Sequence, residues 1–183
     1  MSIREAVSKV LDEVGGALGA ADLEATERLV EAVRSARRVY LAGEGRSGLV
    51  ARTFAMRLVH LGMTSYVCGD TVTPAIEPGD LAITCSASGE TSITVHRAKR
   101  SHEAGAAVAA ITAVSGTPLG AAADIEVVLP APTKHGGGRP SCQFGSTLFE
   151  QVLLIYLDAV VLLLQQRAGA SYDAMAAKHA NLE

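Results

Sequence analysis

The chain has 183 residues, of which 49% are apolar and 4% aromatic. This length fits one domain, and the preference for Ala, Val and Leu favours tightly packed helices and a large subunit interface. The net charge of −3 comes without a basic stripe, which excludes a typical nucleic-acid-binding surface.

The expected elements follow in chain order. Two amphipathic helices, 2–18 and 22–36, are separated by a break at Gly15-Gly16. Strands are predicted at 39–42, 64–68, 81–85, 108–112 and 125–129. Helices are predicted at 49–61 and 91–104, with a short Pro118-containing helix before the last strand. A glycine-rich loop, 130–145, leads to a long helix at 147–167 and a short one at 171–178.

Strands alternate with helices, which predicts an α/β fold: a three-layer αβα sandwich around a five-stranded parallel sheet. We expect the flavodoxin-like strand order 2-1-3-4-5. The N-terminal helices (1–36), the sheet region (37–130) and the long helix with its tail (145–183) then form one domain, 1–183. In this order the loops after the first and third strands line one crevice, which places Ser47 opposite Ser86, Ser88 and Thr91.

Three features bear on location. The cysteines, Cys68, Cys85 and Cys142, lack CxxC spacing, which indicates a reducing compartment and no zinc site. Charged residues interrupt the N-terminus, so we expect no signal peptide. The apolar stretch 152–164 is too short to span a membrane and contains Asp158. We therefore expect a cytoplasmic protein without a membrane partner.

The loop Ser86-Ala87-Ser88-Gly89-Glu90-Thr91 follows an apolar strand and precedes a helix. Free amides at a helix start attract anions, Gly89 permits close approach, and the hydroxyls of Ser86, Ser88 and Thr91 add donors, which predicts a phosphate site. The alternative is that Ser88 and Thr91 only cap the helix.

The first loop supports two interpretations. Gly43-x-Gly45-x-x-Gly48 matches a dinucleotide fingerprint, with Asp70 as the ribose-binding acid. The side chains of Arg46 and Ser47 instead suit a compact phosphosugar. The phosphosugar interpretation also gives the hydroxyl-rich loop 86–91 a role, so we favour it over the dinucleotide interpretation.

Glu150 and His179 are candidates for proton transfer. Thr147-x-x-Glu150 reads equally well as a capping box at a helix start, and a histidine near the end of a chain is commonly solvated. His135 lies with Lys134 and Arg139 in the 130–145 loop, which is either a lid or a plain connector.

Several of these stretches together resemble the sugar isomerase (SIS) domain family, and within it 6-phospho-3-hexuloisomerases. The matching stretches are Gly45-Arg46-Ser47-Gly48, Thr73-Pro74-Ala75-Ile76, Ser86-x-Ser88-Gly89-Glu90-Thr91, Phe149-Glu150 and the tail His179-Ala180-Asn181-Leu182-Glu183.

The resemblance implies an isomerase of the ribulose monophosphate pathway, serving formaldehyde fixation or pentose supply. It would interconvert D-arabino-hex-3-ulose 6-phosphate and fructose 6-phosphate without metal or cofactor, as a homotetramer with active sites near subunit boundaries. It implies that Glu150 is the base, and that His179 is a proton shuttle or ring-opening acid that acts either in its own subunit or in a neighbouring one. Arg46 would contact sugar hydroxyls or neutralise the phosphate. The alternatives are an isomerase of another sugar phosphate and a non-catalytic sugar-phosphate sensor.

Overall fold

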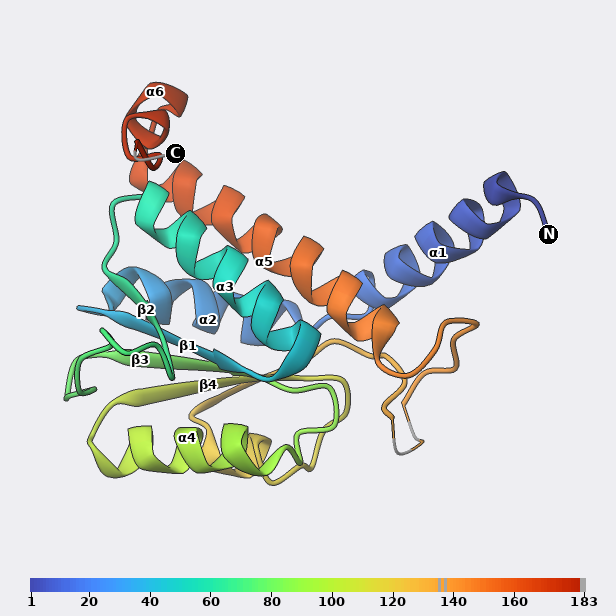
Figure 1. Cartoon of the computed structure of the whole chain (residues 1–183), viewed down its shortest axis with the longest axis horizontal. Helices are drawn as coiled ribbons and strands as arrows, with labels where there is room; N and C mark the ends of the chain where they lie inside the picture. Colours follow the sequence, from blue (N-terminus) through green and yellow to red (C-terminus); the bar gives the residue numbers. More distant parts are fainter. Residues whose placement is uncertain (135, 137, 182–183) are drawn as a thin grey trace.

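The computed structural model describes residues 1–134, 136 and 138–181 (Figure 1). The candidate residue His135, Gly137 of the glycine-rich loop, and Leu182 and Glu183 of the tail lie outside the described residues. The helices are α1 (Ile3–Leu18), α2 (Leu23–Ser35), α3 (Gly45–His60), α4 (Ser92–Glu103), α5 (Thr147–Ala168) and α6 (Tyr172–Ala176), with a 3₁₀ turn, η1 (Gly120–Ala122). The strands are β1 (Val39–Gly43), β2 (Ser65–Val67), β3 (Leu81–Cys85), β4 (Ala107–Thr112) and β5 (Ile125–Val128).

The five strands form one parallel sheet in the order β2-β1-β3-β4-β5, as predicted. Helices α2, α3 and α5 cover one face, and α4 with η1 covers the other (Figure 1). The three-layer αβα sandwich is therefore confirmed. Gly43 at the end of β1 is the register partner of Cys85 at the end of β3, so the two following loops start side by side.

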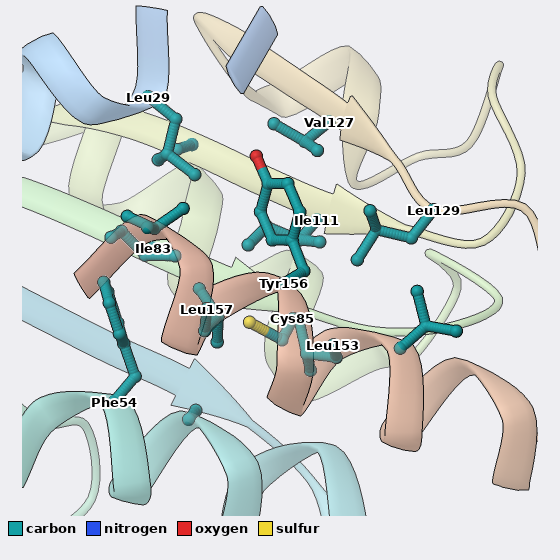
Figure 2. Packing of buried hydrophobic residues seen from close by; sticks show 14 of the residues in the cluster. Leu29, Phe54, Ile83, Cys85, Ile111, Val127, Leu129, Leu153, Tyr156 and Leu157 are labelled. Carbon is teal, nitrogen blue, oxygen red and sulfur yellow. The ribbon is translucent and has the colours of Figure 1, made fainter. Parts of the chain in front are cut away.

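The larger part of the core lies between the sheet and α5. Figure 2 shows Leu153, Tyr156 and Leu157 of α5 facing Ile83 and Cys85 of β3, with further contributions from α2, α3, β4 and β5. Helix α5 extends on both sides of the apolar stretch 152–164. Its 22 residues are enough, by length and composition alone, to cross a membrane, yet half of its most apolar window is buried inside the molecule.

Three local predictions are wrong. Helix α1 continues through Gly15 and Gly16 to Leu18, and the residues on either side of the two glycines, Val14 and Ala17, are buried in the core. Helix α3 begins at Gly45 rather than Leu49. The first turn of α3 packs closely on the end of β1: a Cβ at Gly48 would lie 2.4 Å from the Gly43 carbonyl oxygen, so only glycine permits this approach. The expected Pro118-containing helix is the 3₁₀ turn η1, which starts after Pro118.

An ionic cluster around the buried Asp80 joins the amino ends of β1 and β3. The Asp80 carboxylate, fully shielded from solvent, accepts hydrogen bonds from Arg38 (2.6 Å), Arg37 (3.2 Å) and the Glu77 amide (2.9 Å). Burial alone would raise the pKa of Asp80, but these donors lower it to about 2. The cluster lies at the sheet end opposite the loops of interest and stabilises the strand pair that positions them.

Candidate functional site

A cavity of about 230 Å³ opens at the carboxyl ends of β1 and β3. We call it the serine cavity. It is lined by Glu44, Gly45, Ser47, Cys85, Ser86, Ala87, Ser88, Thr91, Lys134, Ser146 and Glu150. Five predicted site residues thus meet here, although they come from three separate parts of the sequence: Ser47, Ser86, Ser88, Thr91 and Glu150.

Three helices begin at the wall of this cavity, and none of them has a side-chain cap among the described residues. Their N-cap residues are Glu44 for α3, Thr91 for α4 and Ser146 for α5. The other described α-helices, α1, α2 and α6, each have a capping side chain. Uncapped helix starts carry free backbone N–H groups and the positive end of the helix dipole. Because such helix starts attract anions, three of them together make this cavity a candidate anion site.

The hydroxyls of the Ser86–Thr91 loop, which follows β3, form hydrogen bonds within the loop and do not cap α4. Ser86 Oγ and Thr91 Oγ1 lie 3.1 Å apart, and Ser88 Oγ accepts a 3.3 Å hydrogen bond from the Glu90 amide before α4 begins. The purely capping alternative for Ser88 and Thr91 is therefore not what the structure has. Gly89 makes the turn possible, with a φ of +63°.

Glu150 lies in the first turn of α5 with its side chain 13% exposed, and forms an ion pair with Arg46 of α3. The alternative, a Thr147-x-x-Glu150 capping box, is not formed: the N-cap residue is Ser146, and the Thr147 hydroxyl donates to the Phe144 carbonyl (2.7 Å). Arg46 does not line the serine cavity but an adjoining one of about 470 Å³, which shares Lys134, Ser146 and Glu150 with it. The Glu150 carboxylate thus lies on the boundary between the two cavities.

Three lining residues were missed as site residues. Ser146 and Glu44 are helix caps by sequence position, but their side chains cap nothing among the described residues. Lys134 was considered only as part of a lid, and it brings an ammonium group with no ion partner in the described structure. The sequence held one signal for Ser146: it directly precedes α5, the helix that carries Glu150 in its first turn.

A further cavity of about 260 Å³, the glycine cavity, lies over the Gly43-x-Gly45-x-x-Gly48 turn. Arg52 and Arg97 also line it. Asp70, which the dinucleotide alternative needs for a ribose, is held by Arg52 at 2.7 Å.

His179 lies beside the last residue of α3, whereas the serine cavity lies at the first turn of that helix. Figure 1 shows the C-terminus of the chain near the carboxyl end of α3. The ring of His179 stacks on that of His60, with centroids 5.2 Å apart. Burial and the neighbouring Arg57 lower the pKa of His60. Since Ser47 to His60 spans about 20 Å of helix, one chain does not bring His179 to the cavity.

Two further features bear on other kinds of chemistry: the thiol of Cys85 and the spacing of the side chains that could bind a metal. Burial raises the pKa of the Cys85 thiol in the cavity wall to about 12, which keeps it protonated. Among the described residues, no three His, Cys, Asp or Glu side chains gather in a way that could hold a metal ion.

Comparison with known proteins adds the family. The SIS domain family model matches residues 32–166. The chain is 42% identical to the 3-hexulose-6-phosphate isomerase of Mycobacterium gastri, covering 97% of this chain and 89% of that protein. It is 36% identical to the enzyme of the same name from Bacillus subtilis over the full length of both. It also superposes with a TM-score of 0.85, at 30% identity and over 98% of this chain and 99% of the other, on a Methanococcus jannaschii protein. The crystal structure of that protein infers a function of 3-hexulose-6-phosphate isomerase.

These similarities confirm the resemblance found in the sequence, including the closer one to 6-phospho-3-hexuloisomerases. The chain belongs to the SIS domain family.

Proposed function

We propose that this protein is a 6-phospho-3-hexuloisomerase that interconverts D-arabino-hex-3-ulose 6-phosphate and D-fructose 6-phosphate. The observation that carries the proposal is the meeting of three uncapped helix starts with five hydroxyl side chains and two carboxylates, one of them Glu150, around the serine cavity. The similarity to enzymes named for this activity supports the choice of substrate.

In this proposal the phosphate occupies the serine cavity, held by the helix amides and by the hydroxyls of Ser47, Ser86, Ser88 and Thr91. Lys134 adds positive charge. This remote binding positions the sugar carbons against Glu150, towards the adjoining cavity. Arg46, already paired with Glu150, contacts the sugar hydroxyls there.

The reaction moves the carbonyl from C3 to C2. Glu150 removes the proton from C2, the electrons of that bond form the enediolate, and a proton returns to C3 while the O2 proton is passed to O3. Donors near the two oxygens stabilise the developing negative charge. We assign the second proton-transfer role to His179 of a neighbouring subunit in a homotetramer, because within one chain it lies too far away.

The test is isomerisation of fructose 6-phosphate by the purified protein, followed by NMR in deuterated water, with binding measured by calorimetry. Glu150→Gln should retain binding and lower turnover about 100- to 10,000-fold. Asp158→Asn, an exposed carboxylate two turns along the same helix, is the matched control and should retain turnover.

Each alternative has its own outcome. Binding of fructose 6-phosphate by the wild type without turnover would favour the sensor alternative. Turnover of another sugar phosphate, with none of this one, would favour the other isomerase. Unchanged turnover in Glu150→Gln would remove Glu150 from its role.

A further inference from the structure

Glu44 presents a problem for the proposed phosphate site. It is the N-cap residue of α3 and lines the serine cavity, with its side chain 45% exposed. A free carboxylate at this wall would repel a phosphate dianion. The same residue also lines the glycine cavity, so it separates the two spaces.

Arg97 of α4 holds this carboxylate from the glycine-cavity side. Its Nη1 donates to Glu44 Oε1 at 2.6 Å, and its side chain is only 25% exposed. Gly69 leaves room for it, since a Cβ there would lie 3.1 Å from Arg97 Nη2. Arg97 lines the glycine cavity and is absent from the lining of the serine cavity. The ion pair therefore joins α4 to the N-cap residue of α3, and Arg97 itself does not line the cavity proposed to hold the phosphate.

We propose that Arg97 is a positioning residue for phosphate binding. By holding the Glu44 carboxylate on the glycine-cavity side and neutralising its charge, it keeps the serine cavity receptive to a dianion. This inference rests on the proposed function. It adds a determinant of affinity outside the cavity, acting on an acid that would otherwise oppose the substrate.

The chain offers a matched control in the same cavity. Arg52 also lines the glycine cavity and also pairs with an acid, Asp70, at 2.7 Å. Asp70 does not line the serine cavity. Breaking the Arg52 pair, whose arginine is 50% exposed, removes an arginine–carboxylate pair from the same cavity without releasing a carboxylate towards the phosphate.

The experiment compares wild type, Arg97→Ala, Arg97→Lys, Arg52→Ala, Glu44→Gln and the double variant Arg97→Ala/Glu44→Gln. Binding of inorganic phosphate and of fructose 6-phosphate is measured by calorimetry, and KM and kcat by the isomerase assay. Arg97→Ala should weaken both ligands about tenfold and raise KM while kcat changes less than about threefold. Arg97→Lys should fall between it and wild type.

Rescue separates charge positioning from structural damage. Glu44→Gln should bind phosphate at least as well as wild type, and the double variant should recover to within about threefold of it. Arg52→Ala should bind like wild type. If Arg97→Ala binds as tightly as wild type, or the double variant stays as weak as Arg97→Ala, the inference is overturned while the proposed function stands. A wild type that binds neither ligand overturns both.

Discussion

Replacing Gly89 by alanine tests the geometry of the phosphate loop through its stability. The residue has a φ of +63°, and an added Cβ would lie 2.2 Å from Thr117 Oγ1 and 2.4 Å from Thr117 Cβ. A left-handed backbone costs a non-glycine residue about 1–2 kcal/mol. Forcing a methyl group into packed surroundings adds about 1–3 kcal/mol. We therefore expect a loss of about 2–5 kcal/mol in the free energy of unfolding.

The control is Gly169→Ala at the end of α5. Its φ is +62°, and a Cβ there would meet nothing within 4 Å, so it carries the backbone cost without the collision. Urea unfolding at one fixed protein concentration measures both variants. Gly89→Ala should be the less stable by about 1–3 kcal/mol and should also bind phosphate more weakly. Equal stability of the two variants would refute the described packing of Gly89 on Thr117.

Two further predictions concern Asp80 and Ser88. Asp80→Asn should lower the free energy of unfolding by about 1–3 kcal/mol, because the buried side chain loses its charge-assisted hydrogen bonds with Arg38 and Arg37, which keep only Glu77 as an ionic partner among the described residues. Because the native pKa of Asp80 is lowered to about 2, its contribution is present above about pH 4 and lost as the pH falls; urea unfolding at pH 7 and pH 3 should show a smaller acid loss in this variant. Ser88→Ala should weaken fructose 6-phosphate binding by about 1–3 kcal/mol, whereas the exposed Ser92→Ala should not; equal calorimetric affinities would leave Ser88 without a ligand role.

The fold could be predicted because its signals are local and repeated. Apolar strands alternate with amphipathic helices, and parallel strands joined by helices leave few possible orders. The errors fall where tertiary contacts override local preference. Glycines normally end helices, yet α1 continues through Gly15 and Gly16. The start of α3 depends on the close approach of Gly48 to the Gly43 carbonyl, which no periodicity reveals.

The cavity was predictable from its hydroxyls and from the helix start after β3, but the uncapped starts of α3 and α5 were not predicted. Thr147-x-x-Glu150 has the composition of a capping box, and only the structure shows Thr147 bonded to Phe144 and Glu150 paired with Arg46. The same residue types serve both arrangements, so composition cannot separate them. Lys134 was missed as a cavity residue because the described residues of its loop form no helix or strand from which the direction of a side chain can be inferred.

The place of His179 depends on how the tail folds and on what the chain assembles with. From Glu150 to Ala168, α5 carries the chain about 27 Å away from the cavity. Fully extended, the residues between Ala168 and His179 could cover about 36 Å, but α6 shortens that path and His179 packs on His60 instead. A proton-transfer role for His179 therefore requires a second chain to present it. Patterns within one sequence do not encode that arrangement. The position of Glu150 follows from the helix that carries it, whereas the role proposed for His179 depends on the proposed homotetramer.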